Sequence, residues 1–481
     1  MECKSLNSAD SFQHYTYHNL KMVKTNDTYN SNTIYDIAII GGGVVGLTTL
    51  RNLTNKGYKC ILLEKNDHLL QEASGSNSGI ICTGVDAPLG SLERSCIRDS
   101  ISEIRIYCEM NNIPTRSCGS LVCIRKANVE NGDNGEKMLE EVAKESWDAG
   151  DTDVRILSKE EVMELEPNLE ANDLLGAVHI VGEIVVDPWL LPISYAVHAR
   201  SKGACIITSF PYDPKTSHFD NDVNIWHINN STIKARVLVN ATGIQADIVQ
   251  SCTSSNDMVS QQLPLPKWEA KPRRGQYRIF KYDNSSPLLT HPIQPVPTQH
   301  TKGIFLFSSI YNHIIVGPTA TEQGSRTDRC PDAQTTSSLT SYAKSLLPHL
   351  KDESCAVIDD YVGIRPATNH RDYQIHLHPK LNWITASGIR STGLSASLGI
   401  GRYVTNLVSS ILPKSTNDVQ TSSSSLQAIP PLQNLIDEFH SFENGCVHIN
   451  GYSYKVTHPI TINGWNHSNL FTFSSNVTSH L

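Results

Sequence analysis

Three glycines and one acidic residue near the N-terminus have the spacing of a dinucleotide site. Gly41, Gly43 and Gly46 follow an apolar run at 34–40, and Glu64 ends a second apolar run 18 residues beyond Gly46. In such a site the first glycine permits a tight turn, the second lets the backbone approach a pyrophosphate, and the third lets the following helix pack closely. The helix N-terminus favours the phosphate charge, and the carboxylate accepts a hydrogen bond from a ribose 2′-OH. The spacing therefore predicts dinucleotide binding; the alternative is a glycine turn in a plain α/β domain.

A run of small and hydroxylated residues, 73–86, follows this motif. Such residues let the backbone run flat against a planar ligand, and their side chains can hydrogen-bond to phosphate. Because Ile80 and Ile81 lie within the run, an ordinary surface loop is the weaker interpretation. We therefore expect a second ligand-contacting segment here.

The elements expected to position these residues alternate between strands and helices. Residues 34–64 predict a strand, a glycine turn, a helix and a second strand. Farther along, the segments 275–280, 303–307 and 314–317 follow an antiparallel pattern, with prolines and glycines between them. Because this pattern interrupts the α/β segments, we expect an α/β fold: a Rossmann-like nucleotide-binding domain with an inserted α+β domain built on an antiparallel sheet. Further helices are expected at 92–110, 136–149, 188–200, 337–350 and 397–411.

The chain divides into four parts. Residues 1–33 are polar and rich in Ser, Asn and Tyr, and we expect a disordered N-terminal arm. Residues 34–411 form the main body, and the Ser/Thr-rich residues 412–425 form a linker. The remaining residues, 426–481, form a C-terminal extension to which we assign no chemistry.

The composition argues against several classes of function. The net charge of −8 and the lack of a Lys/Arg-rich block argue against nucleic-acid binding. No apolar run reaches the roughly 18 residues that a membrane-spanning helix needs. The 12 cysteines contain no CxxC pair and no Cys/His cluster, which argues against a metal site and a disulfide framework. We therefore expect an intracellular protein, cytoplasmic or mitochondrial, with reduced thiols and no metal.

Taken together, the motifs resemble those of a known enzyme family. Besides the glycine motif and the run 73–86, the chain has Asn-Ala-Thr-Gly at 240–243 and a small-residue turn at 388–395. This set is similar to that of FAD-dependent oxidoreductases of the D-amino-acid oxidase type, and most similar to the glycerol-3-phosphate dehydrogenase and L-2-hydroxyglutarate dehydrogenase branch. The resemblance covers roughly residues 34–411. It implies FAD-binding parts at about 34–115, 187–255 and 355–411, and substrate-domain parts at about 116–186 and 256–354.

The resemblance implies FAD as the cofactor and assigns its contacts. The glycine motif and the 240–243 turn would hold the phosphates, and the 388–395 turn would lie beside the isoalloxazine. The helix from Ser397 would point its N-terminus at the flavin C2 carbonyl. No cysteine stands where some amine oxidases tether flavin, so the resemblance implies non-covalent FAD; NAD as the ligand is disfavoured. The implied cofactor-binding residues are Gly41, Gly43, Gly46, Glu64, Ser74, Ser76, Asn77, Ser78, Cys82, Thr242, Gly243, Gly388, Thr392, Gly393 and Leu394.

Three further residues are implied around the substrate. Arg365 matches an arginine that holds an anionic group, which agrees with the chemistry of a guanidinium that stays charged and forks onto carboxylate or phosphate. Tyr277 would face the cavity from its strand, and Arg390, flanking the flavin turn, would be a second anion contact. The alternative for Arg365 is a buried structural arginine.

One position departs from the family pattern. Related sequences usually carry histidine where this chain has Cys82, close to the flavin. A thiol with an ordinary pKa near 8.5 is a poorer base than histidine, so the proton acceptor stays open. His179, His291, His313 and His376 are reserves, and for each the alternative is a surface or core histidine.

The sequence thus predicts an FAD-dependent dehydrogenase that oxidises the CH–OH group of a small anionic substrate, such as glycerol 3-phosphate or an L-2-hydroxy acid. The electron acceptor stays open. One alternative is an FAD-dependent amine or amino-acid oxidase. Another is a flavin-binding protein without turnover, with the C-terminal region serving as an interaction module.

Overall fold

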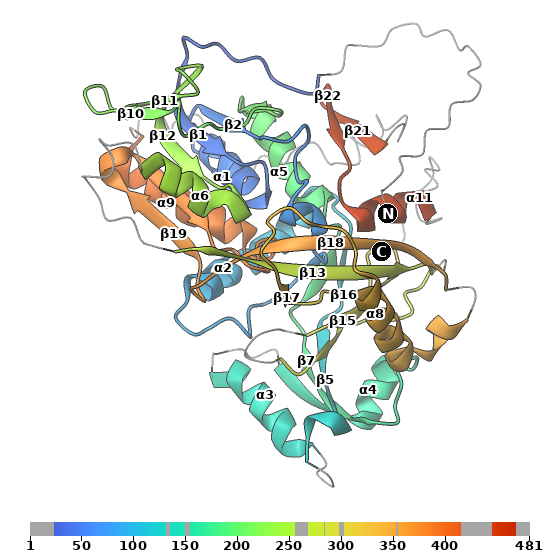
Figure 1. Cartoon of the computed structure of the whole chain (residues 1–481). Coiled ribbons are helices and arrows are strands. Elements are labelled where there is room, and N and C mark those ends of the chain that lie inside the picture. Colours follow the sequence, from blue (N-terminus) through green and yellow to red (C-terminus); the bar gives the residue numbers. More distant parts are fainter. Residues whose placement is uncertain are drawn as a thin grey trace, which may run out of the picture.

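Two large sheets make up the core of the protein, as the computed structural model shows in Figure 1. Parts of the predicted N-terminal arm, linker and C-terminal extension lie outside the described residues. None of the described helices has the length and apolarity needed to cross a membrane. The structure describes residues 24–130, 135–148, 150, 154–254, 268–282, 284–297, 303–352, 355–414 and 445–467.

The first sheet is built around the apolar strand β1 (Ile34–Ile40), which pairs in parallel with β2 (Cys60–Leu63) and β12 (Ile233–Asn240). Both faces of β1 are covered: Ile37 and Ile39 face one apolar cluster, whereas alternate residues face another. Burial on both faces explains why β1 reads as a continuous apolar run. The remaining strands are β9 (Cys205–Ile207), β10 (His218–Asp220), β11 (Ile225–Ile228), β19 (Gln374–His378) and β20 (Trp383–Ser387).

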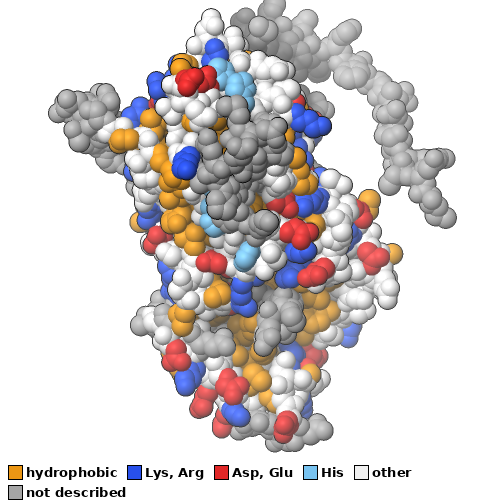
Figure 2. Space-filling view, turned by 60° about the vertical axis from the view of Figure 1, so that its left-hand side comes forward, with side chains coloured by type: hydrophobic (Ala, Val, Ile, Leu, Met, Phe, Trp, Pro, Cys, Tyr) orange, Lys and Arg blue, Asp and Glu red, His pale blue; other side chains and the backbone are white. Residues whose placement is uncertain are grey.

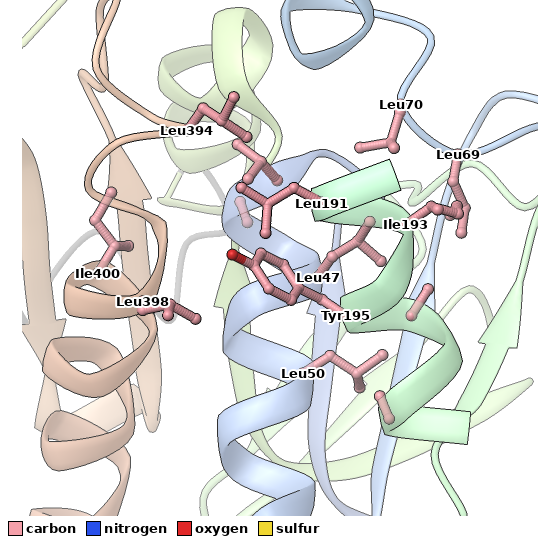
Figure 3. Packing of buried hydrophobic residues seen from close by; sticks show 14 of the residues in the cluster. Leu47, Leu50, Leu69, Leu70, Leu191, Ile193, Tyr195, Leu394, Leu398 and Ile400 are labelled. Atoms are coloured by element: carbon pink, nitrogen blue, oxygen red, sulfur yellow. The ribbon is translucent and has the colours of Figure 1, made fainter. Parts of the chain in front are cut away.

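Three helices lie beside this sheet: α1 (Val44–Asn55) packs against both α5 (Leu190–Ser201) and α9 (Ser397–Ile411). Figure 3 shows Leu47 and Leu50 of α1 beside Tyr195 of α5, with Leu398 of α9 on the other side. The helix α2 (Leu92–Met110) packs on α9, where a Cβ at Gly399 would overlap the backbone of Cys96. The glycine therefore lets α9 approach α2 closely and fixes where the N-terminus of α9 lies.

The second sheet is mostly antiparallel, and its longest strands are β13 (Ala270–Phe280) and β18 (Val357–Thr368). The two strands cross the middle of the molecule in Figure 1 and pair from Ala270↔Thr368 to Phe280↔Val357. The other strands are β5 (Ser120–Arg125), β6 (Val154–Ser158), β7 (Leu174–Ile180), β14 (Ile293–Pro295), β15 (Phe305–Ser308), β16 (Ile314–Gly317) and β17 (Thr321–Glu322). Helices α3 (Glu136–Asp148), α4 (Lys159–Leu165) and α8 (Ala333–Leu346) accompany them.

Two boundaries differ from the sequence expectation. β18 joins the second sheet, although 355–411 was assigned to the FAD-binding parts, because its pairing partner β13 lies far away in the chain. α8 begins at Ala333, four residues earlier than expected, because the Asp332 side chain caps it by accepting from the Thr335 N–H at 2.7 Å.

Segments from the two ends of the chain meet beside α5. Lys24 bridges to Tyr452 of the hairpin formed by β21 (Cys446–Ile449) and β22 (Tyr452–Lys455). Asp27 forms an ion pair of 3.0 Å with Arg200 of α5, whose guanidinium lies 4.0 Å from the Tyr452 ring centroid. The hairpin leads into α11 (Pro459–His467). The described part of the predicted arm is thus attached to the body.

Candidate active site

A cavity of about 470 Å³ is lined by residues from both sheets and from the 73–82 segment. All three predicted substrate residues and most of the predicted cofactor residues lie on its wall. Gly46 and Gly388 do not line it, and a Cβ at either position would overlap a neighbouring backbone atom. The predicted residues that line the cavity are Gly41, Gly43, Glu64, Ser74, Ser76, Asn77, Ser78, Cys82, Thr242, Gly243, Tyr277, Arg365, Arg390, Thr392, Gly393 and Leu394.

The glycine turn after β1 has the geometry that its spacing predicts. Gly41 has φ +108°, and a Cβ there would overlap the Ala241 carbonyl. A Cβ at Gly46 would overlap the Gly41 carbonyl, so Gly46 lets α1 start directly against the strand. At Gly43 the nearest atom to such a Cβ is the Ser74 Oγ, at 3.1 Å. The turn therefore brings the N-terminus of α1 to the cavity.

Glu64 lies directly after β2 and is held by backbone N–H groups. Its Oε2 accepts from Gly42 at 2.6 Å and its Oε1 from Asn66 at 2.8 Å. Burial raises the pKa of Glu64, while the two hydrogen bonds act in the opposite direction. The side chain is therefore fixed at the cavity wall, next to the glycine turn.

Several predicted polar side chains are bonded within the protein. The Ser74 hydroxyl accepts from the Val44 N–H at 3.0 Å, and the Asn77 side chain donates to the Ser74 carbonyl at 2.8 Å. Thr242 donates to Asn240 at 2.7 Å. These side chains hold the loops in place through hydrogen bonds within the protein. The backbone of the same loops lies at the cavity wall, where it can contact a ligand.

The turn before α9 is joined to α2 by a buried carboxylate. Glu93 accepts from Thr392 at 2.7 Å and forms an ion pair of 3.0 Å with Arg390. Tyr373 lies 2.6 Å from the same threonine hydroxyl. Glu93 could not be identified from the sequence, because its partners lie about 300 residues away in the chain.

Arg365 and Tyr277 reach the cavity from the paired strands β18 and β13. Arg365 donates through Nη2 to the Thr319 carbonyl, and its Nε has no hydrogen-bond partner among the described residues. Burial lowers the pKa of this guanidinium, as do the positive charges of Arg273 and Arg390. No described carboxylate forms an ion pair with it. Arg365 therefore retains capacity to bind an anion.

Tyr277 stacks on Tyr361, with 4.5 Å between the ring centroids and 8° between the planes. Burial raises the pKa of Tyr277 to about 12, although the charge of Arg365 opposes the shift. The phenol therefore stays protonated near neutral pH and cannot act there as the base.

The reserve histidines lie away from the cavity. His291 contacts Glu166 at 2.7 Å, and its ring centroid is 5.1 Å from that of His179. His313 is buried and His376 contacts Gln374, and the described lining residues include no histidine. Cys82 lies on the wall, with its N–H bonded to the Ser395 hydroxyl at 3.0 Å.

Two glycines on the central strands were missed as site residues. Gly275 and Gly363 are paired in the register of β13 and β18. A Cβ at Gly363 would lie 2.9 Å from the Cβ of Ser76, and one at Gly275 would lie 3.2 Å from Nη2 of Arg365. Only the strand register, which the sequence does not provide, identifies this pair.

The fold and the cavity together define a flavin-dependent oxidoreductase. The family model described as "FAD dependent oxidoreductase" (DAO) matches residues 36–407, and the chain belongs to this family. The predicted fold class and family are confirmed.

Several relatives share this family. A glycerol 3-phosphate dehydrogenase of Caloramator mitchellensis is 26% identical over 79% of this chain and 75% of its own length. A glycerol 3-phosphate oxidase of Mycoplasma pneumoniae is 27% identical over 79% of this chain and 96% of its own. A mitochondrial L-2-hydroxyglutarate dehydrogenase of Nematostella vectensis is 26% identical over 60% of this chain and 62% of its own.

A solved structure supports the cofactor. The dithionite-reduced L-α-glycerophosphate oxidase of Mycoplasma pneumoniae, with FAD bound, has a TM-score of 0.66 and 25% identity, covering 78% of this chain and 95% of the other. FAD is the cofactor of this chain. The residues present fit it, because one cavity combines the open α1 N-terminus, glycines with no room for a side chain and the fixed carboxylate of Glu64.

Proposed function

We propose that this oxidoreductase acts as a dehydrogenase on the CH–OH group of a small anionic substrate, such as glycerol 3-phosphate or an L-2-hydroxy acid. The observation that carries the proposal is the Arg365 guanidinium, which lines the cavity with an Nε that no described group accepts from. A guanidinium in such a position binds carboxylate or phosphate through charge-assisted hydrogen bonds. The relatives named for glycerol 3-phosphate and L-2-hydroxyglutarate support this substrate class.

Each residue of the wall has a role in this proposal. Arg365 binds the anionic group, and Arg390, which its ion pair with Glu93 holds at the wall, is the second anion contact. Tyr277 presents a protonated phenol that can donate to substrate. The loops described above would hold FAD non-covalently, and the flavin would supply the hydride acceptor. The described wall contains no histidine, and Cys82 lies at the position where related sequences usually have one. The acceptor of the hydroxyl proton, a base or water, therefore stays open.

The test is an anaerobic absorbance spectrum of the purified protein before and after each candidate substrate is added. Loss of the flavin band near about 450 nm with glycerol 3-phosphate or L-2-hydroxyglutarate supports the proposal. Bleaching by amines or amino acids alone would assign the protein to C–N oxidation instead. A spectrum that no substrate changes would contradict turnover on these donors.

A further inference from the structure

The segments outside the family match include residues that contact the loop lining the cavity. Residues 24–33 and 445–467 lie outside the matched range 36–407 and contact each other through the Lys24–Tyr452 bridge. Figure 1 shows β21 and β22 on the α5 side of the molecule, and α11, which contacts β18, below them. The body thus carries a structured C-terminal segment that the family model does not include.

A buried carboxylate anchors this segment. Asp187 is fully buried and accepts from the Trp189 N–H at 2.8 Å, at the start of α5. Its other oxygen accepts from the hydroxyl of Tyr311 and, at 3.0 Å, from that of Thr461 in α11. Trp465 donates to the Tyr311 hydroxyl at 2.8 Å. Three separate parts of the chain therefore meet at one acid, which fixes α11 in place.

His458, directly before α11, reaches the cofactor loop. It is fully buried, and its Nδ1 accepts from the Ile460 N–H at 3.2 Å. The proton of the neutral ring therefore sits on Nε2, which donates to the Asn77 carbonyl at 3.0 Å. The Tyr361 hydroxyl donates to the same carbonyl at 3.2 Å. Asn77 itself lines the cavity.

A second contact joins the same two segments. The Thr457 hydroxyl donates to the Leu70 carbonyl at 3.0 Å, and the same carbonyl lies against Gly75. The Asn77 side chain spans its own loop, donating to Ser74 and accepting from Gly79 at 2.8 Å each. Because these hydrogen bonds hold the loop in one conformation, a contact that fixes the Asn77 carbonyl also fixes the position of the whole 74–79 segment.

We propose that His458 is a positioning residue for FAD, which acts through the Asn77 carbonyl to hold the 74–79 loop against the cofactor. The C-terminal segment is in this way part of the cofactor site. Burial lowers the pKa of His458 to about 3, so the ring stays neutral throughout the neutral range and Nδ1 continues to accept from Ile460.

The experiment compares full-length variants by the dissociation constant of FAD from the apoprotein and by the flavin absorbance spectrum. His458→Phe keeps a planar ring and removes the donor. We expect FAD binding about fivefold weaker, the effect of one lost hydrogen bond, with a shifted flavin band. His458→Gln, whose amide N–H₂ can reach the same carbonyl, should restore most of the affinity.

Two further variants separate positioning from stability. Leu339→Ala removes buried apolar contacts of α8, away from the cavity and the C-terminal segment, and should lower the melting temperature while leaving FAD affinity and spectrum unchanged. Tyr361→Phe removes the other donor to the Asn77 carbonyl, so its effect should be non-additive with that of His458→Phe. The proposal fails if His458→Phe binds FAD like the wild type, or if Leu339→Ala weakens FAD binding equally. If His458→Phe does not fold, Tyr361→Phe is measured alone, and wild-type FAD affinity in it would overturn the proposal.

Discussion

At the scale of single residues, Arg365 differs from its neighbours because no described carboxylate balances its charge. Arg390 and Arg326 have carboxylate partners, Glu93 and Asp247. Arg365 instead donates to backbone carbonyls of Thr319 and Arg274. A partly buried cation without a counter-ion costs stability, which binding of an anion offsets.

The corresponding substitution is Arg365→Gln. Hydrogen bonds to a charged group contribute about 1.5–3 kcal/mol, so we expect kcat/KM to fall by about tenfold to a hundredfold. FAD binding should be retained, since Arg365 was assigned to the substrate. Steady-state kinetics and the flavin spectrum measure the two effects. Arg402→Gln, which alters an exposed pair with Glu103, is the matched control. Unchanged kinetics in Arg365→Gln would contradict the anion site.

The residues that the sequence placed at the cavity are those whose position depends on local spacing. Gly41 and Glu64 could be assigned because the turn and the strand end fix their positions. The partners of Thr392 and Arg390 could not, because Glu93 comes from a distant helix. Local pattern therefore predicts which loops reach the cavity, and tertiary packing decides which of their atoms face it.

At the scale of elements, the pairing of β13 with β18 sets the shape of the cavity. The register places Tyr277 opposite Tyr361 and Gly275 opposite Gly363. The Tyr277 and Tyr361 rings stack on each other. Because Gly363 has no side chain, the Ser76 loop can lie directly against its strand. A strand at 275–280 was predicted, but its pairing with β18 was not, because antiparallel alternation does not specify the partner.

Gly363→Ala tests this element. The new Cβ would lie 2.9 Å from the Ser76 Cβ, so the loop or the strand must shift. Overpacking of this kind costs about 1–3 kcal/mol, and we expect a lower melting temperature together with weaker FAD binding. Gly324→Ala, where a Cβ would have nothing within 4 Å, is the matched control. Thermal unfolding with and without added FAD measures both effects; equal behaviour of the two variants would refute the packing argument.

At the scale of the whole molecule, the distribution of surface charge does not indicate a ligand or a partner. Figure 2 shows basic and acidic side chains dispersed over one face, in keeping with a modest net charge of −8. The interior is more informative, because burial lowers the pKa of His198 and His458 to about 3 and that of His378 to about 4. All three are neutral in the folded protein at pH values where they become charged in the unfolded chain.

This difference predicts acid sensitivity. Between about pH 6.5 and pH 4 the unfolded state binds more protons, so stability rises with pH and is lost on acidification. Each such histidine contributes up to about 1.4 kcal/mol per pH unit in that window. Replacing His378 by Leu should flatten the pH dependence of the free energy of unfolding by up to that amount. Denaturant titrations at pH 7 and pH 5.5 measure it, and an unaltered slope would contradict the burial argument.

The contact between Lys24 and Tyr452 has a consequence for the order in which the protein is completed during synthesis. At about 5–20 residues per second, a ribosome needs roughly 20–90 s to travel the 428 residues (452 − 24) that separate them. Until then Asp187 lacks Thr461 and the Asn77 carbonyl lacks His458. The nascent Rossmann half therefore remains without these two contacts until residues 458–461 have been synthesised.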